Sequence, residues 1–126
     1  MRLYARHLIA VLDRSTRIFD KASVAASRKG GNMNALDQAC VYWGDKVQYV
    51  GSQSEGIPHP AKWYTLVGRF HHRMAGVYHY MIGAMTQCQT AAEGGDPSEG
   101  ADAISTIAQA TRMMHRLNAD AHRQSR

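Results

Sequence analysis

The sequence predicts an all-α fold, an antiparallel four-helix bundle with a long central third helix. Apolar residues recur every three or four positions along four segments of the 126-residue chain, which is the spacing of an amphipathic α-helix. Short polar breaks that contain glycine or proline separate the segments, and no stretch alternates apolar and polar residues as a half-buried strand does. We therefore expect residues 1–126 to form a single helical-bundle domain.

The first predicted helix spans residues 2–28 and is the most clearly amphipathic segment. Its charged face includes Arg6 and Arg17. We expect a glycine of the pair Gly30-Gly31 to end the helix in the left-handed conformation that glycine adopts easily. The apolar face consists of Tyr4, Leu8, Val11, Leu12, Ser15, Ile18, Phe19, Ala22 and Ala26.

The second predicted helix begins near Asn34, because Asn34 and Asp37 have the spacing of a helix start. Residues 51–60 are predicted to be a loop, since the segment is polar, contains glycine and ends with two prolines that favour extended backbone. The apolar face of this helix consists of Leu36, Ala39, Cys40, Trp43, Val47 and Val50.

The third predicted helix runs to about Thr90 and has Pro60 in its first turn. Its core side consists of Trp63, Val67, Phe70, Met74, Val77, Met81, Met85 and Cys88, with Leu66 and Tyr78 flanking. Its opposite side consists of Thr65, Gly68, Arg69, His72, Gly76, His79, Gly83 and Thr86, with Arg73 and Tyr80 beside them. Glycine on an exposed helix face costs about 1 kcal/mol relative to alanine, so we expect a partner to lie close to this side.

The last predicted helix begins with Asp96 as N-cap, Pro97 in the first position and Glu99 in the third. Acidic residues crowd its first turns, and arginines, including Arg112 and Arg116, crowd its last turns. This distribution complements the helix dipole, so we attribute the charge of this helix to the dipole rather than to a ligand. The residues expected to face inward are Ala103, Ile107, Ala110, Met114, Leu117 and Ala121.

The formal net charge of +5 is concentrated on the first and third predicted helices, which indicates an anionic partner. The first 29 residues hold seven Lys/Arg against two Asp, and residues 58–92 hold three basic and no acidic residues. The candidate nucleic-acid-binding residues are Arg69, His72, Arg73, His79, Tyr80, Arg6 and Arg17. The candidate interface residues are Gly68, Gly76 and Gly83, which would admit the backbone of a partner or of a second subunit.

These residues predict a small, basic, non-catalytic binding module that contacts nucleic acid, either RNA or a single strand, and forms a homo-oligomer. The absence of a convincing helix-turn-helix pattern argues against binding to a specific duplex sequence. The alternative is a protein–protein adaptor, inhibitor or accessory subunit that docks on an acidic partner.

A third hypothesis comes from the segment Arg73-Met-Ala-Gly-Val-Tyr-His79. It resembles the Arg-x(4–6)-His motif of HEPN-type ribonucleases, which are also small all-α bundles. The resemblance implies cleavage of RNA, with Arg73 stabilising phosphate charge and His79 performing acid–base chemistry. It covers only these residues, and Met74 stands where many family members have a polar residue.

The seven histidines do not have the spacing of a metal site within one helix. No Asp, Glu, Cys or His lies three or four positions from His72, His79 or His115, as chelation from a single helix requires. The sequence contains no CxxCH motif for haem attachment either. We therefore expect no metal and no cofactor.

Cys40 and Cys88 both fall on predicted core faces. The simplest interpretation is a pair of free, buried thiols in a cytoplasmic protein, with a disulfide between them as the alternative. The apolar run near the first residue is too short for a signal peptide and too charged for a membrane span, so neither secretion nor membrane insertion is expected.

Overall fold

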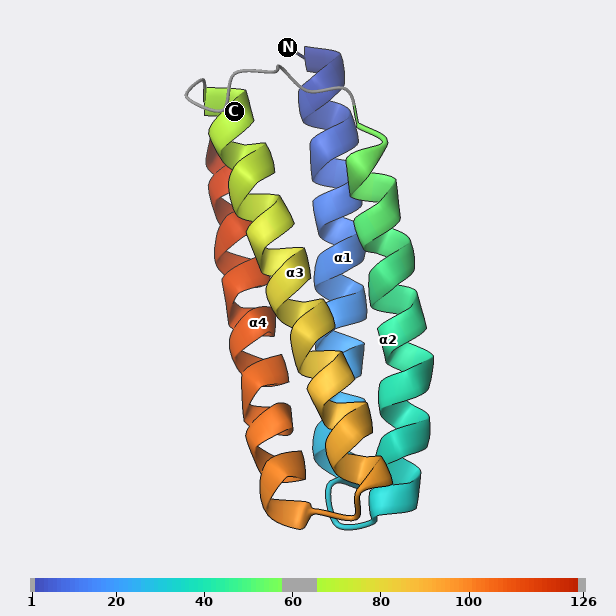
Figure 1. The fold of residues 1–126 in the computed structure, drawn as a ribbon. Helices are drawn as coiled ribbons and strands as arrows, with labels where there is room; N and C mark the ends of the chain where they lie inside the picture. The colour runs from blue at the N-terminus through green and yellow to red at the C-terminus, as the bar shows by residue number, and fades with distance from the viewer. Residues whose placement is uncertain (1, 58–65, 125–126) are drawn as a thin grey trace.

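A computed structural model describes residues 2–57 and 66–124, which form four α-helices and no strand (Figure 1). The helices are α1 (Arg2–Lys29), α2 (Met33–Glu55), α3 (Leu66–Glu93) and α4 (Pro97–Gln124). The predicted all-α four-helix bundle is therefore confirmed. The third helix is not exceptional in length, because α1, α3 and α4 have 28 residues each in the described part of the chain.

Each helix packs against two neighbours. α1 and α3 both pack against α2 and α4, so α1 and α3 lie diagonally across the bundle, and α3 stands in front of α1 in Figure 1. Consecutive helices run in opposite directions. The start of α1, the end of α2, the start of α3 and the end of α4 therefore lie at the same end of the bundle.

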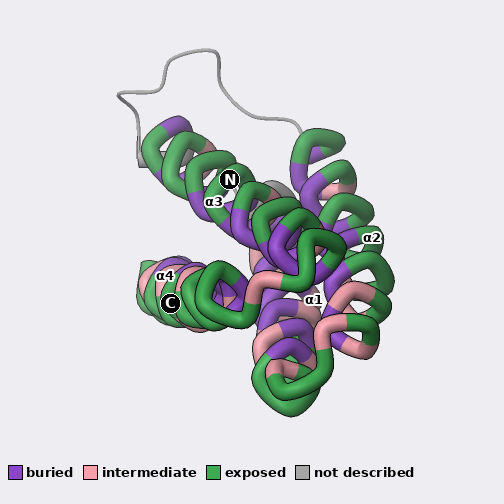
Figure 2. The backbone as a smooth tube through the Cα atoms, turned by 60° about the horizontal axis from the view of Figure 1, so that its bottom comes forward, coloured by how far each residue is buried: buried purple, intermediate pink, exposed green. Residues whose placement is uncertain are grey.

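The predicted apolar faces meet in one core, and Figure 2 shows the buried residues turned toward the interior of the bundle. This agreement confirms the predicted helical phase of all four helices. The large side chains with no exposed surface include Leu12, Phe19, Leu36, Val47, Met81, Ile107 and Met114. Trp63 of the predicted core side, Thr65 of the opposite side and Pro60 of the predicted first turn lie outside the described residues, and the side chains of Tyr4, Leu66 and Val67 are not described.

A hydroxyl pair crosses the core between the two diagonal helices. Ser15 of α1 is fully buried, and its hydroxyl forms a short hydrogen bond with the hydroxyl of Tyr78 of α3. The ring of Tyr78 meets Phe19 edge to face, with 5.8 Å between the ring centroids. Burial raises the pKa of Tyr78 to about 12, and the hydrogen bond from Ser15 opposes only part of that shift. Tyr78 therefore stays neutral and ties α3 to α1.

The end of α1 and the start of α2 differ from the prediction. Asn32, not Asn34, is the N-cap of α2, and its side-chain oxygen accepts the backbone N–H of Ala35 at 3.1 Å. Neither Gly30 nor Gly31 adopts the expected left-handed conformation, because Gly95 is the only described residue with a positive φ. The three residues between α1 and α2 end in the capping Asn32, and they reverse the chain without a left-handed glycine.

The turn from α3 to α4 combines a glycine cap at the end of α3 with the predicted start of α4. Gly95 has a φ of 66°, and the N–H of Asp96 donates to the carbonyl of Ala91 at 3.0 Å, which is the pattern of a Schellman cap. The carboxylate of Asp96 then accepts the backbone N–H groups of Ser98 and Glu99 at 3.1 and 3.2 Å. Asp96 is therefore the N-cap of α4, as predicted.

α2 continues to Glu55, so the predicted loop does not begin at Gly51. Gly51 is buried where a side chain would approach the ring of Tyr78, with 3.5 Å between an added Cβ and the nearest ring atom. The hydroxyl of Ser54 is buried too and donates to the carbonyl of Gly51 at 2.6 Å. Tertiary packing therefore overrides the weak helix propensity of this segment. α3 likewise extends past Thr90 to Glu93.

Cys40 and Cys88 form a disulfide that joins α2 to α3, which corrects the interpretation as free thiols. Both residues are fully buried, and their Cα atoms are 6.1 Å apart, within the usual range for a bridge. The sequence placed each cysteine on the core face of its own helix. It did not show that the two cysteines lie at the same level when α2 and α3 pack side by side.

Candidate functional site

The exposed side of α3 is divided into two grooves, one along α4 and one along α2, in the half of the bundle that holds the start of α3. The sequence predicted a single basic surface here. The packing instead places the candidate residues on different sides of α3.

The groove between α3 and α4, called the arginine groove below, has a volume of about 700 Å³. The residues that give it its chemistry are Arg73, Gly76 and Tyr80 from α3, and Arg116, Asp120 and Arg123 from α4. Its lining therefore holds three arginines and one carboxylate.

The carboxylate of Asp120 bridges two of these arginines. Arg73 Nη2 lies 2.9 Å from Asp120 Oδ2, and Arg123 donates to the other oxygen of the same carboxylate. The guanidinium of Arg73 also lies over the ring of Phe70, 5.6 Å from its centroid. Within the described part of the chain, Arg116 makes no ion pair. The groove therefore keeps an excess of positive charge around an internal anion.

Tyr80 provides an aromatic side chain in the same groove. Its hydroxyl donates to Oε1 of Gln109 of α4 at 3.0 Å, and 37% of the residue is exposed. One helical turn earlier, Gly76 is exposed, and an added Cβ there would meet nothing within 4 Å in the described chain. Single-stranded nucleic acids bind in positively charged grooves where aromatic side chains stack on the bases, and this groove holds a tyrosine beside three arginines.

The two arginines that α4 contributes are not among the candidate residues predicted from the sequence. Arg116 and Arg123 were explained by the helix dipole, yet both line the groove that also holds Arg73. Their seven-residue spacing places both on one face of α4, but nothing in the sequence of α4 shows which helix borders that face.

The groove between α2 and α3, called the histidine groove below, has a volume of about 600 Å³. His72 and His79 lie along its α3 wall, and both are exposed. Gly68 lines the same groove and is buried, which corrects its predicted place on the exposed side of α3. The reason is that Gly68 occupies the row of Ala75 and Ile82, which also faces this groove.

The remaining candidate residues do not join either groove. Arg69 and Gly83 are exposed on α3 and line neither one. Arg6 and Arg17 are exposed on α1, which lies diagonally opposite α3. The structure therefore does not bring the arginines of α1 together with those of α3.

The residues of the HEPN-like motif are also separated. Arg73 is paired with Asp120 in the arginine groove, whereas His79 lines the histidine groove on the other side of α3. A phosphate held by Arg73 in its groove would thus lie across the helix from the imidazole of His79. Met74, which lines the histidine groove, is buried in the core.

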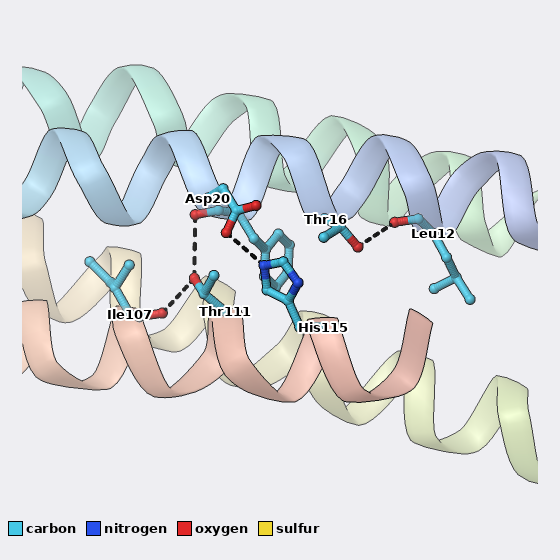
Figure 3. A network of polar contacts seen from close by, with 7 residues as sticks. Leu12, Thr16, Asp20, Ile107, Thr111 and His115 are labelled. Carbon is cyan, nitrogen blue, oxygen red and sulfur yellow. Dashed lines mark hydrogen bonds and ion pairs between the residues drawn. The ribbon is translucent and has the colours of Figure 1, made fainter. Parts of the chain in front are cut away.

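Two histidines of α4 are held by acidic residues of α1 instead of by neighbours on their own helix. His115 Nε2 lies 2.7 Å from Asp20 Oδ1, as Figure 3 shows, and His122 Nε2 lies 2.8 Å from Asp13 Oδ1 one heptad away. In the same seam the hydroxyl of Thr111 donates to the Phe19 carbonyl at 3.3 Å. Among residues 2–57 and 66–124, no group of three or more His, Cys, Asp or Glu is placed to hold a metal ion.

No family model matches the sequence. No curated protein and no solved structure is significantly similar to it either. None of the described helices is long and apolar enough to cross a membrane. Evidence about function therefore comes from the two grooves.

Proposed function

We propose that the protein is a non-catalytic binding module that holds a single-stranded nucleic acid in the arginine groove. The observation that carries this proposal is the convergence of Arg73, Arg116 and Arg123 from two helices beside Tyr80. Arginine matches the geometry of phosphate oxygens, and an exposed tyrosine ring stacks on bases of any sequence. Both features suit a flexible strand that lies along the groove.

The internal ion pairs prepare the groove for an anion. Asp120 holds Arg73 and Arg123 close together, so less side-chain freedom is lost when a phosphate binds to them. The side chain of Arg73 is 48% exposed and that of Asp120 is 28% exposed, so solvent weakens their attraction and a phosphate can compete for the arginine. Asp120 therefore both positions the arginines and limits the affinity.

A matched pair of arginines on α4 tests the proposal. Arg116 lines the groove, whereas Arg112, one turn away and also exposed, does not. We expect Arg116→Ala to weaken binding of a fluorescent single-stranded oligonucleotide by about tenfold, the equivalent of roughly 1.4 kcal/mol, and Arg112→Ala to change it little. Equal losses in both variants would show that only the net charge matters and that the groove is not the site.

A protein–protein module is the second candidate, because α2 exposes a set of apolar and aromatic side chains. Val41, Tyr42 and Tyr49 are 41%, 54% and 63% exposed. Tyrosine is enriched at protein interfaces, and an acidic partner would bind the same arginines through carboxylates. Polyglutamate of matched charge separates the candidates: binding as tight as that of the oligonucleotide favours the acidic protein, and much weaker binding favours nucleic acid.

Self-association is proposed through the exposed side of α3. Gly76 and Gly83 are both exposed, and an added Cβ at either position would meet nothing within 4 Å in the described chain. A second copy could therefore approach the backbone closely at these points. Light scattering of the wild type and of Gly83→Leu, which lines neither groove, measures the oligomeric state without changing the arginines.

The disulfide changes the expected location. Disulfides persist mainly in oxidising compartments and are rare in the cytoplasm. The cytoplasmic prediction assumed free thiols, whereas Cys40 and Cys88 are bridged. We therefore place the folded protein in an oxidising compartment, and thiol labelling of denatured protein taken directly from cells tests this. Fully labelled cysteines would contradict it.

A further inference from the structure

We infer that the histidine groove is a base-binding subsite that receives a base of the strand whose phosphates lie in the arginine groove. The inference rests on the proposed function and adds to it the part of the ligand that carries sequence information. The preferred bases are those with an exocyclic amino group, such as cytosine and adenine.

The two grooves lie at the same level of the bundle, one on each side of α3. His72 and His79 line one groove, while Arg73 and Tyr80, their immediate neighbours in the chain, line the other. Only the width of one helix separates the grooves, roughly 10 Å with side chains. A strand that crosses α3 can thus place a phosphate in one groove and a base in the other.

Gly76 provides the crossing point. It lies midway between His72 and Tyr80, is exposed, and would meet nothing within 4 Å in the described chain if it carried a Cβ. The helix surface is therefore lowest between the two grooves. A leucine at this position would raise a ridge across the path without removing any charge.

The lining of the histidine groove suits a base and not a phosphate. Its floor is formed in part by the buried side chains of Met74 and Tyr78, which offer apolar and aromatic surface to a planar ring. Its volume of about 600 Å³ falls in the range of small-ligand sites. Glu55 is the only formally charged residue of the described lining when histidine is counted as neutral, and its carboxylate repels phosphate.

The rim supplies polar groups for the edge of a base. Gln48, Ser52 and Glu55 lie on the α2 side, and all three are exposed. A glutamate carboxylate accepts hydrogen bonds from the amino groups of bases, as in its pairing with cytosine N4, and the amide of Gln48 both donates and accepts. Uracil and thymine have no amino group to donate to Glu55. The groove therefore favours cytosine and adenine over them.

The experiment compares three fluorescent oligonucleotides of equal length: oligo-dC, oligo-dT and an abasic strand that keeps every phosphate. We expect wild-type protein to bind oligo-dC about tenfold more tightly than the abasic strand, since stacking of a single base is a contribution of that size. Binding of oligo-dT should fall between them. All three strands should show the same dependence on salt, because their phosphates are the same.

Variants of the exposed rim assign the effect to the groove. Glu55→Gln should reduce the preference for oligo-dC over oligo-dT, and His79→Ala should reduce the preference for oligo-dC over the abasic strand, both with an unchanged salt dependence. Arg116→Ala, the control in the arginine groove, should lower the affinity for all three strands by the same factor. Circular dichroism of each variant checks that the fold is kept.

The outcomes separate this inference from the proposed function. If oligo-dC and the abasic strand bind equally and binding falls with salt, the base-binding subsite and the stacking on Tyr80 are both refuted, and only the phosphate contacts of the arginine groove stand. If base discrimination persists in both Glu55→Gln and His79→Ala, the bases bind elsewhere and the inference is refuted as well. If none of the strands binds at low salt, the proposed function is wrong and this inference falls with it.

Discussion

The bridge between Cys40 and Cys88 should supply a large part of the stability of the fold. The two residues are 48 positions apart, so the disulfide closes a long loop of the unfolded chain. The cross-link lowers the conformational entropy of the unfolded chain, and for a loop of this length it should raise the free energy of unfolding by about 4 kcal/mol. Small domains are stable by about 5–15 kcal/mol in total, so reduction should remove a substantial fraction.

Guanidinium unfolding followed by circular dichroism measures this contribution. Because both cysteines are fully buried, the protein must be reduced in denaturant and then refolded in reductant. The double variant Cys40→Ala with Cys88→Ala is the control, since reductant should not alter its unfolding midpoint. Equal midpoints for oxidised and reduced wild type, or free thiols in protein purified without reductant, would refute the reasoning.

Three further predictions follow from named contacts. The pKa of Tyr78 is about 12 in the folded state, against an ordinary value of 10.0. The free energy of unfolding should therefore fall by about 2–3 kcal/mol as the pH rises from 10 toward 12, because the unfolded chain releases this proton first. Unfolding measured at several pH values checks this, and Tyr78→Phe should remove the loss. Met81→Ala should lower the free energy of unfolding by about 2–5 kcal/mol, because Met81 is fully buried. Arg17→Ala should lower it by less than about 0.5 kcal/mol, because Arg17 is exposed. Equal losses in the two variants would contradict the helical phase. Asp120→Asn should tighten oligonucleotide binding about three- to tenfold by releasing Arg73 and Arg123, and weaker binding would mean that positioning by the carboxylate outweighs competition.

The helices and their buried faces could be predicted from the sequence because both are local properties. Leu12 and Met81 are fully buried on the faces that periodicity assigned to the core. The cap at Asp96 was predictable for the same reason, since a capping side chain bonds within three residues. The extension of α2 through Gly51 was not predictable, because it depends on a contact with Tyr78 of another helix.

The candidate site was predictable only in part, because a groove depends on how two helices are aligned. The residues of α3 that line the arginine groove, such as Arg73 and Tyr80, were found from their face on one helix. Arg116 was missed because nothing in the sequence of α4 shows that it lies opposite Arg73. The disulfide was misjudged for the same reason, since its formation requires the relative height of α2 and α3.

The phosphate-binding role of the arginine groove is tested most directly by the salt dependence of oligonucleotide affinity. Three arginines that contact phosphates of a single strand predict a slope of about −2 in a plot of log affinity against log salt concentration. In Arg73→Ala combined with Arg116→Ala, the slope should fall to about −0.7, with the helical content unchanged. A slope that stays the same in the double variant, or no binding by the wild type at the lowest salt concentration, would contradict the assignment of the groove.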